Sequence, residues 1–373
     1  MKIGVLTSSR ADYGIYKPLL QKLALIENID LTLIVFGMHL QEKHAYTVSI
    51  IKKDNFGEVH EVEGMPINDE VIDIARGYGE LIINFSNYWK QFSSYDYVLA
   101  LGDRFEMNAA VQAGIPFQVN FVHFHGGETT LGATDNIYRH QITLASNIHF
   151  VAAENFKNKV IDLIGTSDKV YNVGALSLDN IDNMKLPLWE NVRCKFSIPE
   201  GKFILVTVHP ETMYIDSNKN YSKVIYKALE LLSESTHIVI TLPNADAMGS
   251  LYRQEFFTLK DNYPNRVSLI NNFGKENYFA AMKASEFLLG NTSSGIIEAA
   301  SFEKYVINLG DRQAGRLRSA NIIDVPFVID EILQAADNIK SKRNYKGGNK
   351  YYKKNTVNTI IQILTKKWTT KNI

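Results

Sequence analysis

Cysteine is nearly absent from this sequence, with Cys194 alone among 373 residues. A single cysteine excludes an intramolecular disulfide and any metal cluster held by several thiolates. A net charge is absent as well, because 40 Lys and Arg residues balance 40 Asp and Glu residues. No overall field therefore draws the protein to nucleic acid or to an anionic membrane, and an anion that it binds must be held by a local site.

Long hydrophobic runs are also missing. No apolar run approaches the roughly 20 residues that span a bilayer, and the apolar start of the chain is too short for a signal-peptide core. We therefore expect a cytoplasmic protein. The sequence contains neither G-x-G-x-x-G after its first expected strand nor G-x-x-x-x-G-K-[ST]. Hydride transfer and ATP hydrolysis thus lose their usual sequence support.

What the chain does contain is a regular alternation of short β-branched runs and helical patterns, which predicts parallel sheets with crossover helices. Its length fits two domains, and we place them at residues 1–175 and 176–354. The expected strands are Ile3–Leu6, Leu31–Phe36, Tyr97–Leu101, Val119–Phe124 and Ile148–Ala152, followed by Ile204–Val208, Ile238–Leu242, Val267–Ile270, Phe287–Leu289 and Val306–Leu309.

Polar loops follow most of these strands. In open α/β sheets, ligands bind in the crevice at the carboxyl ends of the strands. Polar loops at these positions in both halves of the chain therefore suggest two crevices that share one ligand. The loops are Ser8–Gly14, Gly37–His39, Gly102–Arg104, His125–Glu128, His209–Glu211, Pro243–Asp246, Gly290–Gly295 and Gly310–Gln313.

Gly290–Gly295 is the best phosphate candidate among these loops. Its glycines and small hydroxyl residues let backbone N–H groups approach an anion, and a helix is expected to start at Ile296. Glu298, on the first turn of that helix, could accept both hydroxyls of a ribose. The alternative is plain helix capping by Ser293 or Ser294, with Glu298 as a surface acid. Arg312 at a neighbouring strand end favours a ligand, because a guanidinium suits phosphate.

Asp103, Glu128 and Asp135 supply carboxylates at or just beyond strand ends of the first half. Each could act as a general acid or base, or instead cap a helix or form an ion pair. His123 and His125 lie on one face of a strand, but no third ligand is evident, so we expect no zinc site.

In this order, the motifs resemble those of the hydrolysing UDP-N-acetylglucosamine 2-epimerases of sialic acid biosynthesis. The resemblance runs from residue 2 to about residue 350. The matching residues are Ser9–Tyr13, Gly37–His39, Gly102–Arg104, His125–Glu128, Asp135 with Arg139 and His140, His209–Pro210, Pro243–Asp246, Gly290–Gly295 and Gly310–Gln313.

The resemblance implies a GT-B fold, that is, two Rossmann-like domains whose parallel sheets face each other across a cleft, with a C-terminal helix at 355–370 that returns to the first domain. It implies conversion of UDP-N-acetylglucosamine and water to N-acetylmannosamine and UDP, with no organic cofactor and no metal. It also suggests a homodimer or a larger homo-oligomer.

The resemblance further assigns roles by position. One set of residues would hold UDP, with Glu298 on the ribose: Arg10, His209, Asn244, Thr292, Ser293, Ser294, Glu298 and Arg312. A second set would face the sugar: His39, Asp103, Arg104, Glu128 and Asp135.

Proton transfer falls to the acids of the second set. We expect UDP to leave first, after which Asp103, or else Asp135, takes the C2 proton to form 2-acetamidoglucal. Glu128 or Asp135 would return a proton from the opposite face.

Two departures from the family pattern matter. Some relatives carry His-x-Glu-Gly-Gly-Glu and assign the first Glu a catalytic part, whereas this chain has His125 there. The role then falls to His125, moves to Glu128 or is dispensable. Several relatives also show Asp-Asp where this chain has Asp135 and Asn136.

Four alternative functions stay open at this point. The substrate could be UDP-2,4-diacetamido-2,4,6-trideoxyglucose, or the enzyme could be a non-hydrolysing epimerase that reattaches UDP. A GT-B glycosyltransferase or a non-catalytic nucleotide-sugar sensor would share the UDP site.

Overall fold

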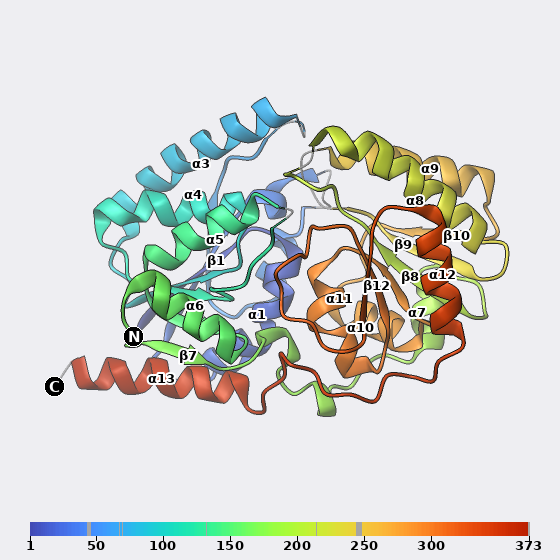
Figure 1. Cartoon of the computed structure of the whole chain (residues 1–373). Helices are drawn as coiled ribbons and strands as arrows, with labels where there is room; N and C mark the ends of the chain where they lie inside the picture. The colour runs from blue at the N-terminus through green and yellow to red at the C-terminus, as the bar shows by residue number, and fades with distance from the viewer. Residues whose placement is uncertain are drawn as a thin grey trace. The chain divides into compact units, whose positions relative to one another are not determined.

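The computed structural model describes residues 1–42, 46–66, 68, 70–131, 133–213, 215–243 and 248–371, the last five without their side chains. It divides into two compact units (Figure 1). Unit 1 comprises Met1–Glu128, Asp135–Asn180 and Tyr351–Ile373. Unit 2 comprises Thr129–Thr134 and Ile181–Lys350.

Unit 1 is built on a parallel sheet that has seven strands within the described residues, in the order β3-β2-β1-β4-β5-β6-β7. Each neighbouring pair is parallel. The strands are β1 (Lys2–Thr7), β2 (Asp30–Phe36), β3 (Glu58–Val62), β4 (Tyr97–Leu101), β5 (Phe121–Phe124), β6 (Ser146–Val151) and β7 (Val170–Asn172).

Successive residues of these strands enter different hydrophobic clusters. Leu33 and Val35 of β2 join one cluster, and Ile34 and Phe36 join the other. A parallel sheet that is covered on both faces needs apolar side chains at both sets of alternating positions. This explains why the central strands read as continuous apolar runs.

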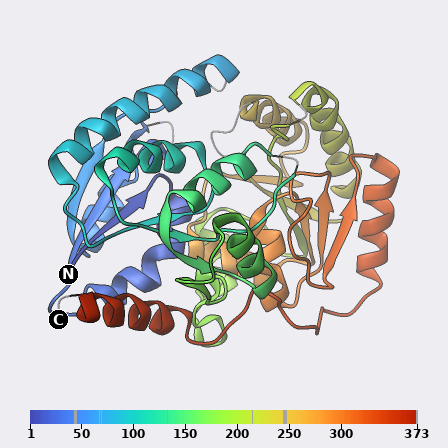
Figure 2. The same cartoon turned by 60° about the vertical axis from the view of Figure 1, so that its left-hand side comes forward.

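Helices cover both faces of this sheet. One face packs against α1 (Arg10–Leu23) and α13 (Thr356–Lys371), and the other against α3 (Val71–Phe92) and α4 (Phe105–Gly114), as Figure 2 shows. The remaining α-helices of unit 1 in the described residues are α2 (Val48–Asp54), α5 (Asp135–Leu144) and α6 (Glu154–Ile164).

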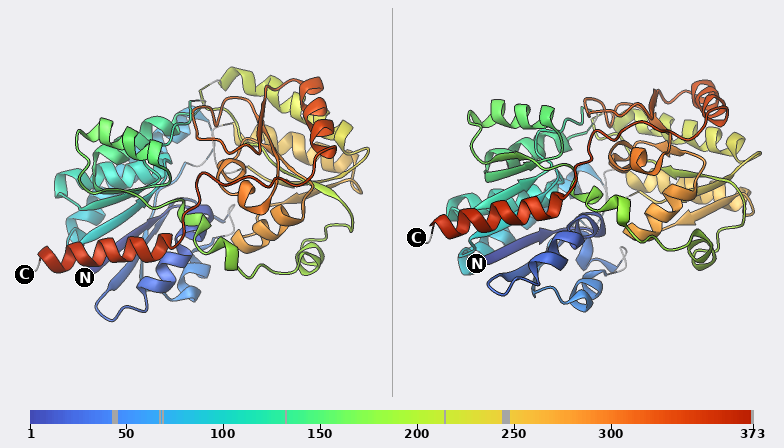
Figure 3. Two further views of the ribbon diagram at one scale, coloured as in Figure 1. Left: turned by 60° about the horizontal axis from the view of Figure 1, so that its bottom comes forward. Right: turned by 90° about the horizontal axis from the view of Figure 1, so that it is seen from below.

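Helix α13 belongs to unit 1 although it follows all of unit 2 in the chain. Val357, Ile360 and Leu364 are fully buried in the same cluster as Leu19 and Leu20 of α1. Figure 3 shows α13 running along the first sheet. The apolar stripe of α13 therefore completes a core that the first residues of the chain begin.

Unit 2 repeats the architecture with a parallel sheet of six strands in the described residues, in the order β10-β9-β8-β11-β12-β13. These strands are β8 (Phe203–Thr207), β9 (His237–Thr241), β10 (Val267–Ile270), β11 (Leu288–Gly290), β12 (Val306–Leu309) and β13 (Ile322–Val325). One face carries α8 (Asn218–Leu232), α9 (Gly249–Asn262) and α12 (Ile329–Lys340), and the other α7 (Trp189–Lys195) and α10 (Lys275–Ala284).

Each sheet has a point where the strand order reverses. In unit 1 it lies between β1 and β4, and in unit 2 between β8 and β11. Crossovers diverge to opposite faces there, which leaves an open crevice at the carboxyl ends of the strands. The loops after β1, β4, β8 and β11 are therefore the positions where each unit can hold a ligand.

Two expectations about local structure were wrong. The helix expected to start at Ile296 begins earlier, as α11 (Ser293–Ile297), because Thr292 is extended and its Oγ1 accepts from the N–H of Ser294 at 3.4 Å. Thr292, and not Ser293 or Ser294, is thus the N-cap. Glu298 consequently lies at the C-cap of α11 and not on its first turn.

Candidate functional site

A buried carboxylate shapes the loop after β1. Asp12 Oδ2 accepts from the N–H of Ser8 at 2.9 Å, and Asp12 Oδ1 accepts from the N–H of Ser9 at 3.1 Å. Ser9 and Asp12 also form a capping box at the start of α1. This reciprocal capping fixes where α1 begins, and with it the position of Arg10, the first residue of the helix.

His39 contacts the start of this loop through a side-chain hydrogen bond with Thr7. Its side chain has no exposed surface, its Nε2 lies 3.0 Å from Thr7 Oγ1, and its Nδ1 lies 2.7 Å from Thr47 Oγ1. Both ring nitrogens are thus engaged inside unit 1. The resemblance placed His39 against the sugar, whereas these contacts suit a residue that positions the β1 loop.

Acidic groups converge at the carboxyl ends of β4 and β5. Asp103 forms an ion pair with Arg139 of α5, and Arg139 Nη1 donates to the main-chain carbonyl of Glu128 at 2.7 Å. The Arg139 side chain is only 1% exposed. A buried guanidinium needs such partners, so Arg139 joins the loop after β4 to the loop after β5.

His125 and Glu128 form a second pair in this cluster. The distance between His125 Nδ1 and Glu128 Oε1 is 2.6 Å, and Glu128 is 1% exposed. His125 has a φ of +65°, which is uncommon for a residue with a side chain. Its buried Nε2 has no hydrogen-bond partner within the described residues. The structure thus places the two residues together at the position where the family pattern is broken.

The remaining expected sugar-side residues lie near this cluster in the chain. Arg104 is the N-cap residue of α4, and its Nε donates to Glu106 Oε2 at 3.1 Å. Asp135 is the first residue of α5, one helical turn before Arg139. Asp103, Glu128 and His125 are thus linked by direct contacts or through Arg139, while Asp135 is placed by its helix.

In unit 2, a buried asparagine ties the loops after β8 and β11 together. Asn291 is fully buried; its Oδ1 accepts from the N–H of His209 at 2.7 Å, and its Nδ2 donates to the carbonyl of His209 at 2.8 Å. Gln313 donates to the Asn291 carbonyl at 2.9 Å. These bonds fix the backbone of three strand-end loops.

Glu211 orients the loop after β12. Its Oε1 accepts from the N–H of Asp311 at 2.6 Å and of Arg312 at 3.2 Å. Burial raises the pKa of this carboxyl group, against the lowering effect of the two N–H donors. Arg312 Nη1 donates to the Pro210 carbonyl at 2.9 Å. The loop after β8 therefore sets both the backbone and the side chain of Arg312.

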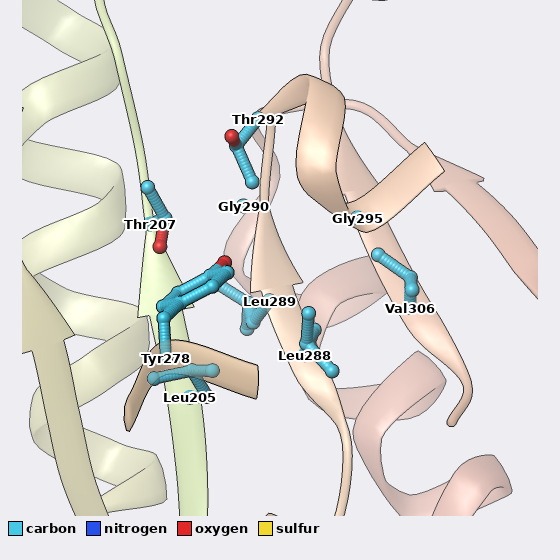
Figure 4. Close-up of a pocket in the computed structure, with 9 residues that line it drawn as sticks. All are labelled: Leu205, Thr207, Tyr278, Leu288, Leu289, Gly290, Thr292, Gly295 and Val306. Carbon is cyan, nitrogen blue, oxygen red and sulfur yellow. The ribbon is translucent and has the colours of Figure 1, made fainter. Parts of the chain in front are cut away.

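The loop after β11 requires glycine. Gly290 has a φ of +147°, and a Cβ atom there would lie 1.8 Å from the carbonyl oxygen of Thr207. A small pocket lies beside this loop, and Figure 4 shows Tyr278 and Thr292 at its wall. Burial raises the pKa of Tyr278, which keeps its hydroxyl protonated and able to donate.

The expected nucleotide-binding residues of unit 2 divide by exposure. Ser293 is exposed, Thr292 and Ser294 are half-buried, and His209 and Glu298 are buried. Asn244 lies outside the residues that the structure describes.

Arg139, Asn291 and Glu211 had no expected role, although each lies within one of the polar loops or family motifs of the sequence. Their contacts span 11 to 101 positions of sequence. What distinguishes these three residues is that they are polar and buried, and their burial is seen only in the structure.

Two features are absent from the described part of the chain. It contains no cluster of three His, Cys, Asp or Glu side chains that could hold a metal ion. Within the same residues, no helix is both long enough and apolar enough to cross a membrane.

Comparisons with known proteins identify the family. A family model described as UDP-N-acetylglucosamine 2-epimerase matches residues 21–365. The UDP-N,N'-diacetylbacillosamine 2-epimerase (hydrolyzing) of Legionella pneumophila is 36% identical, over 97% of this chain and 95% of the relative. Polysialic acid biosynthesis protein P7 of Escherichia coli is 30% identical, over 97% of this chain and 93% of the relative.

A solved structure supports the fold. Methanocaldococcus jannaschii UDP-GlcNAc 2-epimerase, in complex with UDP-GlcNAc and UDP, matches with a TM-score of 0.79 and 18% identity, over 98% of this chain and 100% of that chain. Two Rossmann-like α/β domains with parallel sheets, as in GT-B proteins, are therefore confirmed. The chain belongs to the UDP-N-acetylglucosamine 2-epimerase family and is an epimerase, as the sequence predicts.

Proposed function

We propose that this protein is a hydrolysing UDP-sugar 2-epimerase, which releases UDP and a free sugar inverted at C2. The observation that carries the proposal is the cluster of Asp103, Arg139, Glu128 and His125 in a member of an epimerase family. It groups two carboxylates and an imidazole, the side chains that transfer protons near neutral pH.

The chemistry starts with loss of UDP. The C2 hydrogen of a 2-acetamido sugar has no adjacent carbonyl to acidify it, so the C1–O bond to UDP must break first or nearly so. We assign the departing diphosphate to the loops of unit 2, with Arg312 and the Thr292–Ser294 backbone as donors. Preorganised donors stabilise a charge that develops on a leaving group.

Proton transfer is assigned to unit 1. One carboxylate, Asp103 in the first place and Asp135 in the second, takes the C2 proton and yields the 2-acetamidoglucal. Water then adds its oxygen to C1, and a proton returns to C2 from the opposite face. Because His125 and Glu128 lie 2.6 Å apart, we assign this second proton to the pair rather than to either residue alone.

Two sugars are candidate substrates. UDP-N-acetylglucosamine is the one expected from the sequence. The other is the alternative given above, UDP-2,4-diacetamido-2,4,6-trideoxyglucose, which is also called UDP-N,N'-diacetylbacillosamine. Sequence identity favours this sugar, since the Legionella relative named for it is 36% identical, against 30% for the E. coli polysialic acid protein. Both carry the 2-acetamido group, so the same proton transfers apply.

The proposal is tested by incubating the pure protein with each UDP-sugar in heavy water and following the products by NMR. We expect UDP and a free 2-epimerised sugar that carries deuterium at C2. A UDP-linked 2-epimer would show a non-hydrolysing enzyme, and a product without deuterium at C2 would exclude the elimination. Light scattering of the same sample checks the expected homodimer or larger homo-oligomer.

A further inference from the structure

His123 has no assigned role in the proton transfers, yet its side chain contacts the segments that carry Asp103, Arg139 and the His125–Glu128 pair. It is the third residue of β5 and has no exposed surface. In the sheet it lies beside Ala100 of β4 and His149 of β6. A buried polar side chain is costly unless it is hydrogen-bonded, so its partners indicate what it does.

The first partner is the loop that carries Asp103. His123 Nε2 lies 2.9 Å from the carbonyl oxygen of Gly102. A carbonyl only accepts, so Nε2 bears the proton. Gly102 also donates its N–H to the Phe124 carbonyl at 3.1 Å. The residue before Asp103 is thus held to β5 through both of its peptide groups, in a left-handed conformation with a φ of +83°.

The second partner is α5. His123 Nδ1 lies 3.0 Å from Thr143 Oγ1, and Thr143 is one helical turn after Arg139. Burial lowers the pKa of His123 to about 3, so the ring is neutral and its Nδ1 can accept the Thr143 hydroxyl hydrogen, which the carbonyl of Arg139 at 2.9 Å shares. The ring therefore bridges the Asp103 loop and the helix that carries the ion-pair partner of Asp103.

The third contact is with the loop that carries His125 and Glu128. A Cβ atom at Gly126 would lie 3.1 Å from His123 Nδ1 and 3.2 Å from Thr143 Oγ1. The Gly126 backbone thus packs closely on the imidazole and its partner. The His123 imidazole thus contacts all three segments that carry the cluster, namely the loop after β4, α5 and the loop after β5.

We propose that His123 is a positioning residue of the epimerase reaction. Its imidazole holds the Asp103 loop, α5 and the His125–Glu128 loop at fixed positions relative to one another. This inference rests on the proposed function of the cluster. Misplacing a reacting group by about 1 Å can cost roughly 100-fold in rate, so such a support affects turnover without touching the substrate.

The test compares two substitutions that each keep one half of the ring's hydrogen bonding. In His123→Gln the amide nitrogen occupies the place of Nε2 and still donates to Gly102. In His123→Asn the shorter amide reaches Thr143 but not Gly102. His149→Asn is the matched control, because His149 is 1% exposed and lies beside His123 in the next strand.

We expect kcat to fall about 10- to 100-fold in His123→Asn and less than about 5-fold in His123→Gln, with KM and the Kd for UDP within about 3-fold of wild type. His149→Asn should keep kcat even where its melting temperature falls as far as that of His123→Asn. Equal kcat losses in the Asn and Gln variants, or a loss in the control as large as in His123→Asn, would overturn the proposal.

Failure of this inference is distinguishable from failure of the proposed function. If wild-type protein releases no 2-epimerised sugar, the function is wrong and the role of His123 falls with it. If wild type is active and the variants retain its kcat, only the inference fails. Should His123→Asn not fold, Thr143→Val replaces it, because like His123→Gln it loses the Nδ1 contact and keeps the bond to Gly102. Its kcat should then match that of His123→Gln within about 5-fold, and a larger difference contradicts the proposal.

Discussion

At the scale of single residues, Arg139 connects groups that are remote in sequence. It pairs with Asp103, 36 positions earlier, and donates to the main chain of Glu128, 11 positions earlier. The carboxylates can be recognised in the sequence because they follow strands. The contacts of the Arg139 guanidinium that join them cannot be recognised there. The sequence therefore marked Asp103 and Glu128 as candidate site residues, but it did not indicate the connection between them.

The role proposed for Asp103 is tested by Asp103→Asn. The amide keeps the size of the carboxylate but is a poor base, so we expect kcat to fall about 100-fold or more. The Kd for UDP, measured by calorimetry, should stay within about 3-fold, because we assign the diphosphate to unit 2 and Asp103 to the sugar. Asp162→Asn, at an exposed position of α6, is the control. Turnover close to wild type would rule Asp103 out as the base.

Glu211 lends itself to a test of UDP binding. Glu211→Gln replaces the carboxylate oxygen that accepts from both N–H groups by an amide oxygen, which is a weaker acceptor, so the loop after β12 is held less firmly. We expect the Kd for UDP to rise about tenfold, which corresponds to about 1.4 kcal/mol. Glu303→Gln, which weakens an exposed ion pair with Lys346, should leave the Kd unchanged. An unchanged Kd in Glu211→Gln would show that this loop does not bind UDP.

At the scale of elements, the sequence predicted the central strands better than the edge strands. Tyr97–Leu101 was predicted with the bounds of β4, because all five of its residues are buried. Strands β3, β7 and β13 were missed, whereas the edge strand β10 was predicted. The three missed strands lie at sheet edges, where fewer positions are buried and the apolar pattern fades: only Val62 is buried in β3, and only Val325 in β13.

Strands β5 and β6 carry two adjacent buried histidines that make stability depend on pH. Burial lowers the pKa of His149 to about 4, whereas an unfolded histidine titrates near 6.5. As pH falls below about 6.5, the unfolded state takes up the proton first, so stability is lost toward pH 4 and is complete above about 6.5.

This dependence should weaken in His149→Gln. Between pH 7 and pH 5 the wild-type histidine costs about 2 kcal/mol of stability, because 1.36 kcal/mol corresponds to one pH unit. We expect the variant to lose about that much less between the two pH values, measured by urea unfolding. The same substitution at exposed Lys90 of α3, Lys90→Gln, should preserve the wild-type slope. An unaltered slope in His149→Gln would mean that His149 also titrates normally in the folded state.

At the scale of the whole molecule, the family and the fold were predictable because many short motifs of the family occur along the chain in the family's order. The division of chain segments between the units was harder to foresee. Thr129–Thr134 belongs to unit 2, where the N–H of Leu131 donates to the Ala314 carbonyl at 3.0 Å. No local pattern marks such a contact, because its partner lies 183 positions away.

The dependence of unit 1 on α13 is open to measurement. Ile360 is fully buried, and Ile360→Ala leaves a cavity in the core that α13 shares with α1. Such truncations cost about 2–5 kcal/mol, and we expect a loss in this range by urea unfolding, with the Kd for UDP unchanged. Leu25→Ala, at a side chain that is 84% exposed, should cost less than about 0.5 kcal/mol. Equal losses in the two variants would show that α13 contributes no core.

The late return of α13 also governs how the protein is made. A ribosome builds the whole of unit 2 before it reaches Tyr351 and the helix that closes the first core. Leu19, Leu20 and Leu23 must therefore remain without their final neighbours until Val357, Ile360 and Leu364 have been synthesised. The first core therefore stays incomplete until the sequence of unit 2 has been synthesised, and chaperones have that time to engage the segments of unit 1 that emerge before it.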